Sequence, residues 1–279
     1  NFYYKRGTVE RIPVNDENYF SASKLLESVN SAVNANSHYS YSLEPGGQLE
    51  WASGPSTSLW EIKNQFDENI LIQEKLCKNN GIDIGYFSVE PVSMPFDIRL
   101  IDSEKYRLMN DLFIKTGDLG PWMMRNTTSI QINIDFTDEE DASQMAFVAD
   151  AIQPLMSIMF SNSPFMNAKP TRENLRWKIW GNTDNSRCGS LYDHSINTPK
   201  NFVEKYAEWL LQRDVIFLDN MDGTFSAFNG NFGDMISLKD DNRLIFSAFR
   251  QIFTHVRFKN VLEVRAVSYT HLTLPTIGC

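Results

Sequence analysis

The segment TSIQINIDF, residues 128–136, constrains the fold more than any other part of the sequence. Its three isoleucines alternate with Gln131, Asn133 and Asp135. Successive side chains of a β-strand point to opposite faces, so this alternation predicts a strand with one apolar and one polar face. The polar face carries amide and carboxylate groups, which are suited to a ligand-binding site as well as to contact with solvent.

Two further predicted strands, residues 48–53 and 260–267, also carry polar residues two positions apart. If the sheet curls, these faces meet in a trough lined by carboxylates, amides and arginine. Hard cations such as Mg²⁺ prefer such oxygen-rich surroundings. A half-exposed sheet with solvated polar residues accounts for the same pattern, so the pattern alone does not decide. The residues are Gln48 and Glu50 on one strand, and Glu263 and Arg265 on the other.

The remaining periodicity predicts helices and strands without strict βαβ alternation, which indicates an α+β fold with a largely antiparallel sheet. No linker or repeat interrupts the chain, so one continuous domain is expected. Helices are predicted at 56–79, 103–117, 137–160 (with a kink at Pro154), 199–213 and 242–254, and strands at 82–92, 175–180 and 215–218.

Charge and cysteine content exclude several classes of protein. The net charge of −9 disfavours nucleic acid and anionic membranes as partners, because both require surplus Lys and Arg. No apolar run approaches the roughly 20 residues that span a bilayer. The three cysteines lie far apart without CxxC spacing, so we expect neither a disulfide framework nor a Cys-based zinc site, and a cytoplasmic location.

We expect that both ends of the sequence differ from those of a complete gene product. The chain begins with Asn1, and its last residues, 267–279, continue no helical or strand pattern. We therefore expect one domain over residues 1–266, truncated at both ends, followed by a non-native tail.

The stretch YSLEPGGQLEWASGP places Glu44 and Glu50 on either side of Pro45-Gly46-Gly47. Glycines allow the backbone to turn closely there, because they tolerate conformations that other residues avoid. The two carboxylates are either surface acids beside a hairpin corner or a pair of oxygen ligands for a cation.

Five motifs occur in an order that resembles the glutamate–cysteine ligases of the plant and proteobacterial type. The resemblance extends from about Ser42 to Arg265, and five ordered motifs are more specific than any one of them. The motifs are SLEPGGQLEWASGP, MMRNTTSIQINIDF, SNSPFMNAKP, RWKIWGNTDNSRCG and LEVRA.

The resemblance implies a glutamine-synthetase-like architecture, in which a curved antiparallel sheet forms an open half-barrel backed by helices. It also implies the chemistry of a single catalytic domain. The γ-carboxylate of L-glutamate attacks the terminal phosphate of ATP, and the amine of L-cysteine then displaces phosphate from the acyl phosphate. This is the first step of glutathione biosynthesis. ATP and Mg²⁺ are the implied co-substrate and cofactor, since phosphoryl transfer depends on positioning and charge neutralisation.

The resemblance also implies roles for particular residues. Glu50 and Glu263, with Glu44 as a third candidate, would hold metal. Arg265 would contact ATP phosphate and Arg176 the carboxylate of glutamate, and both count as catalytic, because a guanidinium fork suits phosphate and carboxylate oxygens. Trp180 would form a wall of the glutamate pocket.

Further candidates depend more on context than on motif. Gln131 and Asn133 could bind substrate or metal-bound water, or form satisfied cross-strand amides. Lys169 and Arg187 are candidate phosphate neighbours, although Arg187 could equally form a loop salt bridge with Asp184. Arg125 stands one residue before the position at which the family has arginine. Either Arg125 reaches the substrate from a bulge, or glutamate is bound by other residues.

Residues 1–20 lack the Glu-x-Glu strand with which the family helps to hold its metals. We therefore expect these 279 residues alone to have little or no activity. Two alternatives remain open: a related ligase with another amine acceptor, and a non-catalytic small-molecule-binding domain of the same fold. A plastid location is the alternative if the source is a plant.

Overall fold

The computed structural model describes residues 1–33, 39–220, 222–238 and 241–267. Helices and short, mostly antiparallel strands are mixed along these ranges, as expected for an α+β chain. The described strands form small separate sheets and close no barrel, so the curved half-barrel stays a prediction. Of the expected tail, all but Val267 lies outside the described residues. Within them, no helix has the length and apolarity needed to cross a bilayer.

The largest sheet joins β5 (Ile130–Ile134), β13 (Leu262–Val267) and β12 (Val256–Phe258), with β13 in the middle. Its antiparallel register places Glu263 opposite Asn133 on one side and opposite Arg257 on the other. This confirms the predicted strands at 128–136 and 260–267.

Smaller sheets pair the remaining strands. All of these pairs are antiparallel except β8 with β11. The strand predicted at 82–92 is shortened to β4, and the strand predicted at 215–218 is wrong except for Leu218, where β9 begins. The pairs are β1 (Phe2–Lys5) with β4 (Ile82–Gly85), β2 (Ser40–Leu43) with β3 (Leu49–Ala52), β6 (Phe165–Met166) with β7 (Lys169–Pro170), β8 (Cys188–Gly189) with β11 (Phe253–Thr254), and β9 (Leu218–Asp219) with β10 (Phe225–Ser226).

Most helices lie where periodicity predicts them. The kink expected at Pro154 is a short interruption at Ile152 between α5 and α6, because proline has no backbone N–H to donate. The helices are α1 (Ala22–Ala32), α2 (Leu59–Asn79), α3 (Glu104–Thr116), α4 (Gly120–Asn126), α5 (Glu139–Ala151), α6 (Gln153–Met159), α7 (Leu175–Gly181), α8 (Phe202–Leu211), α9 (Phe232–Ile236) and α10 (Asn242–Arg250), with short 3₁₀ turns at Pro95–Asp97 and Leu191–His194.

The strand predicted at 175–180 is wrong, because this segment forms α7. Asn174 caps the helix by accepting a hydrogen bond from the backbone N–H of Trp177. Leu175 and Ile179, four residues apart, are buried on one face of the helix. Over six residues, the apolar spacing of a helix and that of a strand are hard to distinguish.

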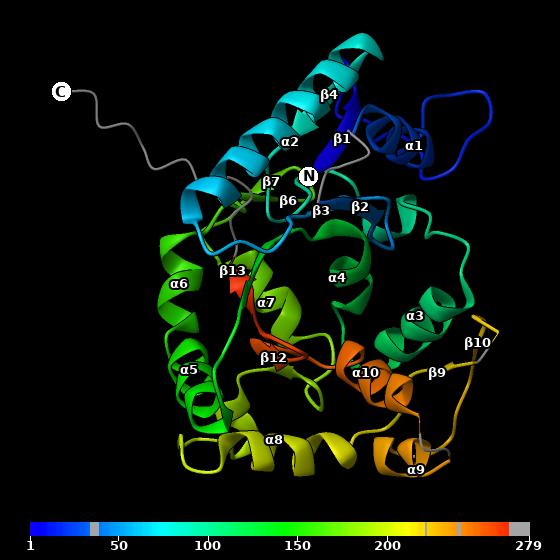
Figure 1. The fold of residues 1–279 in the computed structure, drawn as a ribbon. Coiled ribbons are helices and arrows are strands. Elements are labelled where there is room, and N and C mark those ends of the chain that lie inside the picture. The colour runs from blue at the N-terminus through cyan, green and yellow to red at the C-terminus, as the bar shows by residue number, and fades with distance from the viewer. Residues whose placement is uncertain (34–38, 221, 239–240, 268–279) are drawn as a thin grey trace.

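Three clusters of buried apolar residues hold the chain together. One lies beneath α2 and includes residues of α1, β1 and β4. A second lies among α3, α4 and α7, and the third joins α5, α8, α9 and α10 to β12 and β13. Figure 1 shows α2 at one end of the molecule and α8 and α9 at the other, with α7 and β13 between them.

Candidate functional site

A narrow hollow opens between α7 and the strands that follow α10. Arg176, Trp177 and Trp180 line it from α7, residues 253–255 line it from the chain leading into β12, and Arg265 lines it from β13. Three segments of the chain therefore meet at this hollow, and they bring together two arginines that the sequence predicted to bind ligands.

Arg176 is a buried cation that has no counter-ion among the described residues. Its side chain is on the first turn of α7, the residue is 6% exposed, and Nε donates a hydrogen bond to the carbonyl of Thr128 at 3.1 Å. The guanidinium carbon lies 5.3 Å from the ring centre of Trp180, and no described carboxylate pairs with it. Burial and the nearby charge of Arg265 lower the pKa of Arg176 to about 9. A buried, uncompensated guanidinium is costly, and an anion entering the hollow would offset that cost.

Trp180 lies beside this guanidinium, as expected for a pocket wall. Its ring centre is 5.9 Å from that of Phe253, and its indole N–H is buried without a described hydrogen-bond partner. Buried donors of this kind are normally satisfied by protein or solvent, so this N–H is also available to a ligand.

Arg265 differs from Arg176 because it is paired. Its Nη1 lies 2.7 Å from Oε2 of Glu263 and donates to Oε1 of Gln131 at 3.3 Å. Its side chain is 11% exposed, so part of the guanidinium reaches the hollow.

Glu263 is surrounded by three cations. Oε2 lies 2.7 Å from Nε of Arg257 as well as from Arg265, and Oε1 lies 2.8 Å from Nζ of Lys259. These charges hold the pKa of Glu263 well below its usual range, although burial acts in the opposite direction. Both oxygens of the carboxylate therefore form ion pairs in this structure.

Glu44 and Glu50 flank the turn that joins β2 to β3. Gly47 adopts a φ of +79°, which favours glycine, and a Cβ on Gly46 would lie 2.7 Å from Cα of Arg125. Both glycines are therefore required by the geometry of the turn. Glu50 accepts a hydrogen bond from the Ser42 hydroxyl across the hairpin at 2.9 Å.

The charge of Glu44 connects this hairpin to the arginines. Desolvation by the surrounding protein and, after it, the charge of Glu50 raise the pKa of Glu44 to about 7. The residue nevertheless keeps part of its surface exposed to solvent. Arg265, Lys105 and Arg257 act on the same carboxylate and lower its pKa. The acidic turn therefore lies close enough to Arg265 for the two charges to interact, although neither glutamate lines the hollow.

The residues fit Mg²⁺ only in part. Among the described residues, no three His, Cys, Asp or Glu side chains gather as metal ligands. Both oxygens of Glu263 are occupied by cations, whereas Glu44 and Glu50 repel one another and would gain from a shared cation. Because Mg²⁺ is often held by one or two carboxylates together with substrate phosphates, these two glutamates fit the ion and Glu263 does not in this arrangement.

Arg125 lies away from the hollow. It is in α4, not in a strand, so the expected bulge is wrong. Nε donates to the carbonyl of Ile98 at 3.1 Å, and the guanidinium lies 5.6 Å from the ring centre of Phe96. Its Nη1 is buried without a described partner.

Asn133 and Lys169 are both exposed. Asn133 lies opposite Glu263 in the register of β5 and β13, whereas Lys169 lies on the β6–β7 hairpin. Neither lines the hollow beside Arg176.

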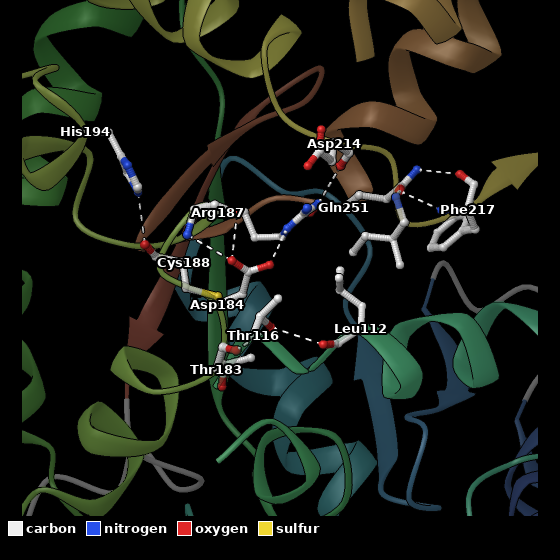
Figure 2. A network of polar contacts seen from close by, with 12 residues as sticks. Leu112, Thr116, Thr183, Asp184, Arg187, Cys188, His194, Asp214, Phe217 and Gln251 are labelled. Carbon is white, nitrogen blue, oxygen red and sulfur yellow. Dashed lines mark hydrogen bonds and ion pairs between the residues drawn. The ribbon is translucent and has the colours of Figure 1, made fainter. Parts of the chain in front are cut away.

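Arg187 forms the salt bridge that the sequence left as an alternative. Its Nε lies 2.8 Å from Oδ2 of Asp184, and Nη1 donates to the carbonyls of Asp214 and Gln251 at 3.0 and 3.4 Å (Figure 2). The residue is 2% exposed, so these bonds join the loop after α7 to the segments that follow α8 and α10.

Sequence reasoning missed three residues of this region, His255, Lys105 and Arg257. Arg257 lies on β12 and Lys259 directly follows that strand, and their spacing of two residues was a usable sign of a basic face opposite Glu263. Nothing in the local sequence marks His255 or Lys105, because both depend on the packing of distant segments.

Taken together, the geometry shows an α+β chain in which two arginines line one hollow and the charge of a nearby pair of glutamates acts on one of them. The model of the glutamate-cysteine ligase family 2 matches residues 9–270. The chain therefore belongs to the glutamate–cysteine ligase family 2.

Known plant proteins are similar to this chain over most of its length. The chloroplastic glutamate–cysteine ligase of Nicotiana tabacum is 29% identical over 261 residues, which cover 88% of this chain and 48% of the relative. The chloroplastic enzyme of Arabidopsis thaliana is 30% identical over 243 residues, covering 81% and 45%. The chain thus spans about half the length of the curated relatives that it matches.

Proposed function

We propose that this chain carries the glutamate-binding part of an ATP-dependent ligase that joins the γ-carboxylate of L-glutamate to the amine of L-cysteine. The observation that carries the proposal is the buried guanidinium of Arg176, which has no described counter-ion and lines a hollow shared with Arg265. The names of the similar plant proteins, glutamate–cysteine ligases, support the same reaction.

In the proposed reaction, an oxygen of the γ-carboxylate attacks the terminal phosphorus of ATP and ADP leaves. The amine of cysteine then attacks the acyl phosphate, phosphate leaves with the bonding electrons, and the amine loses a proton. Arg176 holds the α-carboxylate, so that the γ-carboxylate is oriented towards the phosphates near Arg265. Glu44 and Glu50 would hold Mg²⁺, which supplies neutralisation of phosphate charge.

A binding measurement tests the glutamate pocket without requiring turnover. Calorimetry with L-glutamate should show binding to the chain and a loss on the order of tenfold or more for Arg176→Met, because a charge-assisted hydrogen bond is removed. Arg172→Met is the matched control, since Arg172 is exposed on the loop just before α7. Equal affinity in the two variants would contradict the proposal.

The amine acceptor requires its own assay, because no described contact identifies the second pocket. Product formation from ATP and glutamate should be compared with cysteine, 2-aminobutyrate and other amines. A preference for cysteine supports the proposed reaction, whereas a preference for another amine supports the related ligase. We also propose a plastid location, since the similar plant proteins are chloroplastic.

A further inference from the structure

His255 is a buried histidine that lines the same hollow as Arg176, and the proposed reaction does not yet use it. Its backbone is fixed on both sides. The N–H donates to the carbonyl of Gly189 at 2.8 Å, and the carbonyl accepts from the N–H of Arg265 at 2.8 Å. The imidazole packs against the indole of Trp177, with ring centres 4.5 Å apart. The ring is therefore held in place by its neighbours and by the chain itself.

Asp150 lies beside one edge of this ring. Its Oδ1 is 3.7 Å from Nδ1 of His255, and both atoms are buried without a described hydrogen-bond partner. The other oxygen, Oδ2, accepts from the hydroxyl of Ser190 at 2.6 Å and from the N–H of Tyr192 at 3.3 Å. The carboxylate is thus anchored between α5 and the turn after β8, and its free oxygen faces the histidine.

This arrangement selects a tautomer. An imidazole whose Nδ1 faces a carboxylate oxygen favours the proton on Nδ1, which leaves the lone pair on Nε2. No described residue forms a hydrogen bond with Nε2. The hollow therefore presents a guanidinium from Arg176 and, from His255, an acceptor nitrogen.

We propose that His255, positioned by Asp150, accepts a hydrogen bond from the α-ammonium group of the amino acid whose α-carboxylate binds Arg176. The inference rests on the proposed function and deepens it, because it names the group that distinguishes an amino acid from a simple dicarboxylate. The α-carboxylate and the α-ammonium group of an amino acid are attached to one carbon. Arg176 and His255 line one small hollow, so a donor for the carboxylate and an acceptor for the ammonium group are likewise held together.

The charged groups around the ring agree with an acceptor role. Arg176 and Arg265 line the hollow with it, Asp150 faces its Nδ1, and His194 is also close enough to act on its charge. Burial, with the charge of Arg176 and then of His194, lowers the pKa of His255 to about 4. The ring is then neutral from about pH 6 to about pH 8, so its acceptor function should not change over that range.

The test compares two ligands that differ only in the ammonium group, L-glutamate and glutarate, in two variants of one side chain. The amide oxygen of His255→Gln can replace Nε2 as an acceptor, whereas the shorter side chain of His255→Asn reaches only the position of Nδ1. We expect wild-type chain and His255→Gln to bind glutamate more tightly than glutarate. His255→Asn should lose on the order of tenfold in glutamate affinity and keep its glutarate affinity.

Asp150→Asn should reduce the preference for glutamate in part, because it loosens control of the tautomer without removing Nε2. A circular dichroism spectrum and melting temperature for each variant show that folding is intact. If His255→Asn keeps the wild-type preference for glutamate over glutarate, this inference is overturned and the proposed function stands. If the wild-type chain binds neither ligand, both are overturned.

Discussion

Arg265 and Glu263, two residues apart on β13, form an ion pair in which Nη1 lies 2.7 Å from Oε2. The pair is possible because residues i and i+2 of a strand share a face. The carboxylate of Glu263 is buried and also pairs with Arg257 and Lys259, so it holds three cationic side chains close together. The guanidinium of Arg265 is thereby fixed at the edge of the hollow.

Glu263→Gln should therefore destabilise the fold strongly. Removing one partner of a buried ion pair leaves uncompensated charge and costs about 3–5 kcal/mol in the free energy of unfolding. Urea titration measures this cost. Asp67→Asn is the control, because the exposed Lys63–Asp67 pair on α2 contributes only about 0–1 kcal/mol. A Glu263→Gln effect as small as that of the control would refute this reading.

The carboxylate of Glu263 should also make the free energy of unfolding depend on pH in the acidic range. Its folded-state pKa lies below the unfolded value, so its stabilising contribution is present above about pH 4.5 and is lost as the pH falls further. Urea unfolding of the wild-type chain between about pH 6 and about pH 3 should show this loss, and Glu263→Gln should show less of it. Equal acid sensitivity in both proteins would mean that other carboxylates dominate.

Arg176→Met should separate stability from binding. The guanidinium is buried without a described counter-ion, so an apolar side chain of similar length removes a desolvation cost while losing one hydrogen bond. We expect the free energy of unfolding to change by less than about 1 kcal/mol or to rise. Denaturant unfolding provides the measurement, and a loss of several kcal/mol would show that Arg176 is chiefly structural.

Gly46→Ala should destabilise the acidic turn. A Cβ at this position would lie 2.7 Å from Cα and 2.8 Å from the carbonyl oxygen of Arg125, and such overpacking costs about 1–3 kcal/mol. Gly181→Ala is the control, because a Cβ there has no atom within 4 Å. Similar unfolding free energies for the two variants would contradict the close packing of this turn on α4.

Mg²⁺ should stabilise the chain more as the pH rises. The pKa of Glu44 is raised from 4.5 to about 7, so the free energy of unfolding falls as the pH rises between these two values, and above about pH 7 the carboxylate next to Glu50 is ionised. A cation that binds both carboxylates requires them ionised. The increase in melting temperature on adding MgCl₂ should therefore grow from about pH 6 to about pH 8.

Glu44→Gln should abolish this growth, while Glu17→Gln, at an exposed position outside the site, should preserve it. A magnesium effect that is independent of pH in the wild-type chain would argue against Glu44 and Glu50 as ligands.

The predictable part of the fold is the part encoded by local periodicity. Residues 128–136 and 260–267 alternate cleanly, and both contain strands. Segment 175–180 was assigned to the wrong class because its six residues carry too few apolar positions to separate a period of 2 from one of 3.6. Its flanking Asn174, a good N-cap residue, was the signal for a helix.

Residues of the candidate site were predictable only where they lie within a sequence motif. Arg176 and Arg265 were selected from RWKIW and LEVRA, and the structure places both at one hollow. His255 and Asp150 carry no motif, and their relationship depends on how α5 packs near the segment before β12. The three cations around Glu263 likewise follow from strand register and from the turn between β12 and β13, which composition does not reveal.

The most direct test of the central claim is a crystal structure of the chain with L-glutamate, Mg²⁺ and a non-hydrolysable ATP analogue. The account predicts the α-carboxylate of glutamate on Arg176, phosphate oxygens near Arg265, and Mg²⁺ between those phosphates and Glu44 or Glu50. Glutamate bound elsewhere, with the hollow beside Arg176 left unchanged, would contradict it.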